Sequence, residues 1–263
     1  MTKNKGFSLV SLMVASAIGI FLVSGVMKIY LDSKNSFNFR TSVASAHENA
    51  RFAIQDLQRT LTMAGWGVDA GDDSPQSYKN NDNGKRTFPA VENNKSSSSS
   101  TAGIVDIDDQ GSSIIAVRLA KGQKPCGVAE GASATTKVRF YINSNNELVC
   151  DAGTAQPIIS GIVKMRALYG VETDTGSSSD GMANNFLTAS EVDSQNKWAN
   201  VVSIRIGLIV SSDQTIPATF RPDNIEAKDL LGDVVTLPDK DHFFKSVNTT
   251  IAFRNLHASV KRQ

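Results

Sequence analysis

The chain opens on a long apolar stretch without a single charge. Residues 7–27 read FSLVSLMVASAIGIFLVSGVM. As a helix this stretch spans about 31 Å, close to the hydrocarbon thickness of a bilayer. Lys3 and Lys5 precede it, which predicts that the N-terminus stays in the cytoplasm and that the rest is exported. We therefore expect residues 7–27 to form a membrane-spanning helix.

An amphipathic helical pattern follows the apolar stretch, over residues 28–66. Glu48, Arg51 and other polar residues occupy mainly one side, and Gly65 and Gly67 end the pattern. Apolar residues recur on the other side at steps of three and four, namely Ala46, Ala50, Ala53, Ile54, Leu57, Leu61 and Ala64.

A single helix over residues 7–64 would be about 87 Å long. A globule made from the rest of the chain is only about 40–45 Å across, so half of this helix would have to protrude. The alternative is two helices separated by a break around residues 33–38, where Lys34, Asn35 and Asn38 interrupt the apolar run.

Polar segments and short β-branched runs alternate in residues 67–263. Residues 69–103 and 172–185 are rich in Ser, Asn, Asp and Gly, which predicts surface loops. Residues 158–169 are compatible with a strand or a helix. Strands are expected at 113–119, 138–143, 201–211 and 249–253, with 147–150 closing a hairpin through residues 144–146.

These patterns predict an α+β fold shaped like a lollipop. A long N-terminal helix, with its apolar half protruding, would pack on a head of antiparallel β-sheet. The expected organisation is a leader at residues 1–6, a membrane helix at 7–27, an amphipathic helix at 28–66 and a β-rich head with long polar loops at 67–263.

Composition and charge narrow the function. The 263 residues include 27 Lys and Arg against 26 Asp and Glu, a net charge of +1 that argues against a chain-wide nucleic-acid footprint. His47, His242 and His257 and the two cysteines match no zinc-binding spacing. The sequence holds no phosphate-binding glycine loop and no G-x-S-x-G motif. We nominate no catalytic residue, no metal site and no cofactor, and we expect a protein that is not an enzyme.

Two weaker patterns favour ordinary surface roles. Asp106, Asp108 and Asp109 begin like a calcium loop, but Gln110 and Val117 stand where ligands belong, so a solvated acidic turn is favoured. Four arginines suited to phosphate contacts are scattered along the chain, at Arg51, Arg59, Arg205 and Arg254. Solvated faces or ion pairs explain them more simply, and contact with nucleic acid stays open.

The order of basic residues, Gly6, Phe7 and an unbroken apolar helix resembles the signal of type IV prepilins. The resemblance implies that a prepilin peptidase cuts between Gly6 and Phe7, methylates Phe7 and leaves the apolar helix in place. The fifth mature residue is usually Glu in that family and is Ser11 here. A cleaved secretory signal, with its small-residue site at 15–17, and an ordinary signal anchor are the alternatives.

Further segments resemble the PilW family of minor pilins. Residues 47–54 (HENARFAI), with Leu57, Arg59 and the ending Met-Ala-Gly-Trp at 63–66, are similar to its E-x-A-R-F-A and L-x-R…M-A-G-[YW] pattern. Segments 161–171, 198–206 and 243–255 resemble its G-V…Y-G-V, W-x-x-V-x-x-[VI]-R-[IV] and closing R-N runs.

The resemblance implies a minor pilin that primes type IV pilus assembly and caps the tip, supporting twitching motility, adhesion or DNA uptake. Its partners would be other minor pilins, the major pilin, the prepilin peptidase, the inner-membrane assembly platform and a tip adhesin. It would sit in the bacterial inner membrane with its head in the periplasm, and then in the pilus at the cell surface. A type II secretion minor pseudopilin and a membrane-anchored periplasmic binding domain outside any filament are the alternatives.

Cys126 and Cys150 are the two cysteines of the chain. In an oxidising periplasm a disulfide between them is the default, stabilising the head by about 3 kcal/mol through loop entropy. Two free buried thiols are the alternative.

Overall fold

The computed structural model describes residues 9–64, 112–120, 126, 135–174, 180–195, 197, 200–222 and 224–253. Several sequence predictions concern positions outside these residues. They include the leader with its cleavage position, the helix-ending Gly65 and Gly67, the polar loop 69–103, the acidic turn at 106–111, Arg254 and His257.

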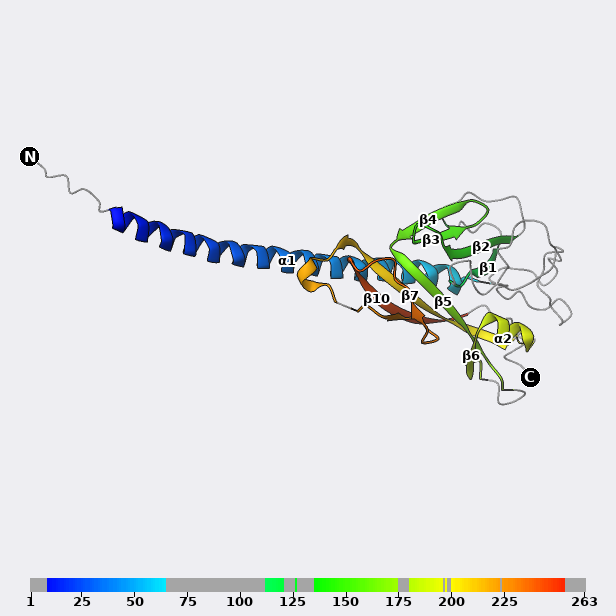
Figure 1. The fold of residues 1–263 in the computed structure, drawn as a ribbon. Helices are drawn as coiled ribbons and strands as arrows, with labels where there is room; N and C mark the ends of the chain where they lie inside the picture. Colours follow the sequence, from blue (N-terminus) through cyan, green and yellow to red (C-terminus); the bar gives the residue numbers. More distant parts are fainter. Residues whose placement is uncertain are drawn as a thin grey trace, which may run out of the picture.

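Helix α1 (Leu9–Thr62) dominates the molecule (Figure 1). Its 54 residues run without interruption, which corresponds to about 81 Å. The expected single helix is therefore confirmed, and the alternative with a break around residues 33–38 is wrong. Intrahelical hydrogen bonding continues through these residues, and the hydroxyl of Thr41 donates back to the carbonyl of Phe37 at 3.0 Å.

The two halves of α1 have different surroundings. Residues 9–34 are exposed apart from partial cover at Gly19, and we call them the stem. Buried positions begin at Ser42 and recur at Ala46, Ala50, Ala53, Leu57, Thr60, Leu61 and Ala64. The spacing of three and four predicted from the sequence is thus the face that packs on the head.

The head contains two four-stranded antiparallel sheets. The first sheet consists, in spatial order, of β1 (Ile115–Ala120), β2 (Thr135–Ile142), β3 (Glu147–Asp151) and β4 (Ala155–Ser160). The second sheet consists, in spatial order, of β10 (His242–Ala252), β7 (Val201–Thr215), β5 (Ile162–Val171) and β6 (Asn185–Leu187). The α+β expectation is confirmed.

The β2–β3 hairpin shows how sequence sets a turn. Asn146 adopts a positive φ of 57°, which Asn tolerates better than most residues. The side-chain oxygen of Asn143 accepts hydrogen bonds from the backbone N–H groups of Asn145, at 3.0 Å, and Glu147, at 2.9 Å. The hairpin predicted through residues 144–146 is therefore confirmed.

Gly161 separates the two sheets. Residues 158–169, ambiguous from their sequence, contribute to two strands, because the chain ends β4 at Ser160 and starts β5 at Ile162. Gly161 has φ of 79°, and a Cβ there would lie 3.0 Å from the backbone oxygen of Ser211. Only glycine fits this corner without strain, and it sends the chain from one sheet into the other.

One hydrophobic core joins α1 to both sheets. Leu57 and Leu61 of α1 belong to the same buried cluster as Ile204, Ile206 and Leu208 of β7. Phe140 of the first sheet and Tyr169 of the second also belong to it, each at most 1% exposed. The head is therefore built around the second half of α1.

The outer face of the second sheet carries a small hairpin, formed by β8 (Ala227–Lys228) and β9 (Val234–Val235). Ala227 and Val235 pack on Ile209 of β7. A Cβ at Gly207 would lie 2.5 Å from Leu230, so the absence of a side chain in β7 makes room for the hairpin.

Helix α2 (Ala189–Ser194) is short and begins with a capping box. The backbone N–H and the hydroxyl of Thr188 both donate to the Glu191 carboxylate, at 2.8 and 2.9 Å. These two bonds lower the pKa of Glu191. A short 3-10 helix, η4 (Ala218–Phe220), follows β7. It lies close to α1, on the side of the head nearer the stem (Figure 1).

Candidate assembly surface

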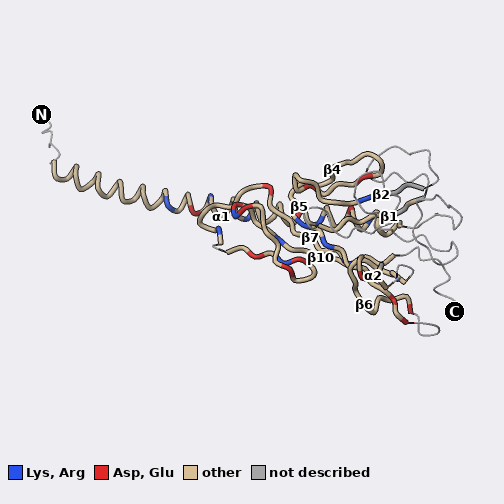
Figure 2. Tube along the Cα trace, turned by 45° about the vertical axis from the view of Figure 1, so that its right-hand side comes forward, with Lys and Arg blue, Asp and Glu red and all other residues tan. Residues whose placement is uncertain are grey.

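The stem presents an apolar surface with nothing packed on it. Leu9 is 71% exposed and Phe21 is 78% exposed. In Figure 2 this half of α1 is tan, without blue or red, over most of its length. In the sequence, Lys28 is the first charged residue after Lys5. A globular protein does not stay soluble with so large an apolar surface, so the stem requires lipid or other helices around it.

Within the described ranges, α1 alone is long and apolar enough to cross a membrane, by length and composition. Its serines suit an apolar medium. The hydroxyl of Ser16 donates to the carbonyl of Met13 at 2.9 Å, and that of Ser24 to the carbonyl of Phe21 at 2.8 Å. Hydroxyls paired inside the helix avoid the cost of an unpaired polar group in hydrocarbon.

Ser11 lies on the exposed part of the stem, where the prepilin resemblance leads us to look for a glutamate. The first turn of α1 contains no acidic residue. The stem therefore offers no carboxylate to a neighbouring helix along its first 23 residues, and the first acidic residue is Asp32.

An aromatic cluster marks the place where α1 enters the head. The ring of Phe39 stacks on Phe220 of η4 with centroids 4.9 Å apart, and it meets the edge of Phe243 in β10 at 6.3 Å. Arg221, next to Phe220, forms an ion pair with Asp241 at 2.9 Å. The cluster ties η4 and β10 to the helix and fixes the direction in which the stem leaves the head.

Polar contacts continue this attachment along α1. Asn49 donates to the Asp213 carboxylate at 2.7 Å, and the hydroxyl of Ser45 accepts from the Asp213 backbone N–H at 3.2 Å. On the same side, Lys245 of β10 lies within 2.9 Å of the ring nitrogens of His47. The second sheet is thus held against α1 by both apolar packing and hydrogen bonds.

Electrostatics on the outer face hold the β8–β9 hairpin in place. Arg166 of β5 donates to the Asp229 carboxylate at 2.7 Å, and the Asp229 side chain is 1% exposed. Burial alone raises the pKa of Asp229, but the bonds from Arg166 and from the backbone N–H groups of Leu231 and Asp233 lower that pKa below its ordinary value. The carboxylate is therefore ionised and firmly paired at neutral pH.

Two further carboxylates have shifted pKa values. Burial against the head raises the pKa of Asp56 on α1, and Arg59 opposes that rise. Burial alone would raise the pKa of Asp239. The hydrogen bond with the His242 ring at 2.8 Å and the bonds from two backbone N–H groups outweigh burial and lower the pKa of this carboxyl. Asp56 lies on α1 and Asp239 lies just before β10, on different elements of the head.

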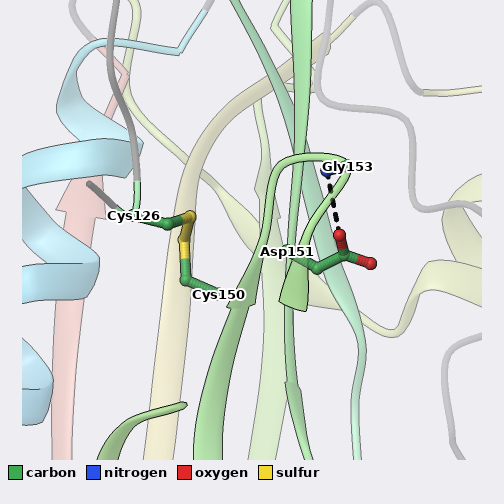
Figure 3. Close-up of a disulfide and its surroundings, with 4 residues drawn as sticks. All are labelled: Cys126, Cys150, Asp151 and Gly153. Carbon is green, nitrogen blue, oxygen red and sulfur yellow. Dashed lines mark hydrogen bonds between the residues drawn. A yellow bond between two sulfur atoms is a disulfide. The ribbon is translucent and has the colours of Figure 1, made fainter. Parts of the chain in front are cut away.

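Cys126 and Cys150 form a disulfide, with Cα atoms 5.6 Å apart (Figure 3). Cys150 lies in β3 and is 1% exposed. The expected pairing is confirmed, and the alternative with two free thiols is wrong. Beside it, the Asp151 carboxylate accepts from the Gly153 backbone N–H at 2.9 Å and closes the β3–β4 turn.

The residues weighed for other chemistry do not come together. Arg51 and Arg59 are exposed on α1, whereas Arg205 of β7 lies over the ring of Phe186, 3.8 Å from its centroid. Val117, the last position of the calcium-like pattern, is fully buried in β1. In the part of the chain that the structure describes, no three acidic, histidine or cysteine side chains are placed to bind one metal ion.

Sequence reasoning missed the aromatic cluster and the outer hairpin. Nothing in the local pattern around Phe220 or Asp229 predicts that these side chains meet α1 and β5. The capping box at Thr188 and Glu191, by contrast, carries a readable S/T-x-x-E signal that predicts the start of α2.

The apolar stem is continuous with a helix that packs in the core of a β-rich head, which is the arrangement expected of a pilin-like fold. Residues 131–255 match the family described as Type IV Pilus-assembly protein W. The resemblance expected from the sequence is therefore confirmed over this region, whereas the motif at residues 47–66 precedes it.

Among solved structures, the chain is similar to a type IV-like pilin from Thermus thermophilus. The two share 11% sequence identity and a TM-score of 0.43, over 80% of this chain and 97% of that one. A search of curated proteins found no significant match.

Proposed function

We propose that the chain is a minor pilin of a type IV pilus. It is made as a prepilin, cut between Gly6 and Phe7, and methylated on Phe7. Until assembly, residues 7–27 hold it in the bacterial inner membrane with the head in the periplasm. The exposed apolar stem continuous with the head core carries this proposal, because such a helix serves first as an anchor and later as a packing element.

In this proposal, assembly proceeds by helix association. Lipid is as apolar as the stem, so close packing of small residues provides the attraction between helices. The stem offers them at Ala15, Ser16, Gly19, Ser24 and Gly25. A Cβ at Gly19 or Gly25 would meet nothing within 4 Å, so the helix surface is open at both positions.

The subunit acts at the start of the fibre. It joins other minor pilins, primes polymerisation of the major pilin on the inner-membrane platform, and ends at the tip, where a tip adhesin binds. Ser11 supports a tip position, since a subunit at the end of a fibre lacks one neighbour and does not need the carboxylate for that contact. Twitching motility, adhesion or DNA uptake would follow from assembly.

The N-terminal residue of the mature protein tests the proposal. Mass spectrometry of the full chain, extracted from membranes and from sheared pili, is expected to find N-methylated Phe7 as the first residue. An intact Met1 or a start after Ala17 would overturn it.

Co-purification distinguishes a type IV pilus minor pilin from a type II secretion pseudopilin. The tagged full chain, cross-linked in cells, is expected to bring down pilus subunits. Recovery of secretion components in their place would assign the chain to the other system, and recovery of neither would favour a binding domain outside any filament.

A further inference from the structure

Strand β10 is a long edge strand with an exposed side. It is the end strand of the second sheet and pairs with β7 through a register that is regular from Phe244 to Ala252. Its residues include no proline or glycine. Natural sheets protect such edges from other chains, so an unprotected one calls for an explanation.

The pair at the C-terminal end of β10 determines which of its residues direct their backbone N–H and C=O groups toward β7 and which direct them away. The backbone N–H of Phe253 donates to the carbonyl of Val202 at 3.0 Å, which makes these residues a hydrogen-bonded pair. Pair types alternate along an antiparallel ladder. Ser246, Asn248, Thr250 and Ala252 therefore direct their N–H and C=O groups away from β7.

These four residues are also exposed at their side chains. In the described ranges, no hydrogen bond from outside the ladder reaches their outward backbone groups. The hydroxyl of Ser246 donates to the Lys228 carbonyl at 3.4 Å, so β8 covers one face of β10 at that end. From Asn248 to Ala252 the outward N–H and C=O groups have no partner among the described residues, and small side chains flank them.

The other sheet edges are protected. Strand β6 has only three residues. Strand β4 carries Pro157, which cannot donate a hydrogen bond to another strand. Strand β1 is buried, with Ile115, Ala116 and Val117 each at most 1% exposed. Among the described strands, β10 alone combines length, exposure and a regular backbone.

We propose that the edge of β10 binds an extended segment of another subunit of the same pilus, which adds to the second sheet as a further strand. This inference rests on the proposed function. The occupant pairs with residues 246–252 through its main-chain N–H and C=O groups.

Symmetry disfavours a second copy of this chain as the occupant. Two copies that pair antiparallel through β10 are related by a two-fold axis normal to the sheet. Helix α1 packs on the face of this sheet, so a half-turn about that normal reverses its direction. The two stems would then point opposite ways and could not enter one membrane or one fibre. A different subunit, with its own stem parallel to this one, meets no such conflict.

Proline substitution distinguishes backbone pairing from side-chain contact. In Asn248→Pro the ring replaces an N–H that points away from β7, so the β7 ladder keeps all its bonds. Asn248→Ala removes the same side chain and keeps the N–H. Each full-length variant is expressed in cells with the remaining pilus subunits and extracted in detergent, and its recovery with those subunits is measured.

We expect Asn248→Pro to lower that recovery by about tenfold, the effect of roughly one lost hydrogen bond, and Asn248→Ala to leave it unchanged. Both variants should melt at the native temperature. Native recovery of a folded Asn248→Pro overturns the inference and leaves the proposed function intact. Absence of the native chain itself from the subunit complex overturns the proposed function.

Hydrogen exchange on the native chain decides the matter if Asn248→Pro fails to fold. The amides of Ser246, Asn248 and Thr250 should exchange quickly in the isolated full-length protein and slowly in the subunit complex. The amide of Thr249, already bonded to β7, should be protected in both. Equal exchange of the three outward amides in both samples overturns the inference.

Discussion

The ring of Phe39 on α1 lies stacked on Phe220 of η4, at a centroid distance of 4.9 Å and an angle of 24°. This contact joins the helix to a segment 181 positions further along the chain, near the point where the stem emerges. Because η4 follows β7 closely in the chain, the stacked pair holds the base of the stem in a fixed position relative to the second sheet.

Phe39→Ala should loosen this junction. We expect the free energy of unfolding of the detergent-solubilised protein to fall by about 1–2 kcal/mol, from lost stacking and some lost burial. Phe37→Ala is the matched control, because Phe37 is 69% exposed and should change stability little. Chemical denaturation followed by tryptophan fluorescence measures both. Equal effects for the two variants would contradict a structural role for the stacked pair.

Leu57→Ala tests the attachment of α1 to the head core. Leu57 is fully buried among residues of both sheets, so the substitution leaves a cavity and should cost about 3 kcal/mol. Phe52→Ala, on the same helix at 50% exposure, should cost less than 1 kcal/mol even though it removes a larger side chain. Denaturation midpoints of the two variants measure both costs. A larger loss of stability in Phe52→Ala than in Leu57→Ala would contradict the packing of Leu57 in the core.

The fold illustrates which features periodicity can predict. The three-and-four spacing from Ala46 to Leu61 predicted the buried face of α1, because a helix must cover its apolar side whatever it packs against. The strands at 138–143 and 201–211 were equally readable, since β-branched residues alternate there over a buried core.

Features decided by tertiary contact were not readable. The strand predicted at 249–253 is the end of β10, which begins at His242, because the polar residues of its first half are stabilised by pairing with β7 and carry no local signal. Asp229 reads as an ordinary turn residue, and only the fold brings it to Arg166. The candidate stem was predicted from composition alone, whereas the aromatic cluster at Phe39 joins three segments distant in sequence.

Acid should weaken the attachment of the outer hairpin. The pKa of Asp229 is lowered in the folded protein, so its contribution to stability is complete above the ordinary carboxyl pKa of about 4. That contribution is lost as the pH falls through the lower folded pKa. Asp229→Asn should therefore cost about 2 kcal/mol at neutral pH and flatten the acid limb of the stability curve below about pH 4.

Asp233→Asn provides the control for this titration. The Asp233 side chain is 68% exposed and lies 3.9 Å from Arg166, so it should contribute little at any pH. Urea denaturation at a series of pH values measures both variants. Parallel acid limbs in Asp229→Asn and the native protein would show that another carboxyl, such as Asp239, controls the transition.

Loss of the disulfide should destabilise the head without changing the stem. The bond closes a loop between residues 24 positions apart, so replacing both cysteines by alanine should cost about 3 kcal/mol. Thermal melts of the double variant and of native protein before and after reduction measure this cost, with thiol alkylation and mass spectrometry as the check on redox state. Free thiols in protein isolated from cells without reductant would contradict the pairing.

Ser11→Glu tests the tip position and needs cells as well as purified protein. At interior positions of the fibre, each subunit would supply a carboxylate at this position to a neighbouring subunit. A subunit with Ser11 cannot supply it, and we therefore expect the native protein at the end of the fibre only. The added glutamate should then allow incorporation along the shaft, since a buried charge is tolerated once it is paired. Ser11→Ala is the control and should stay confined to the tip, because it adds no carboxylate. Immunogold labelling of sheared pili measures the distribution. Native protein found all along the fibre, together with unchanged assembly of Ser11→Glu, would show that position 11 does not determine where the subunit sits.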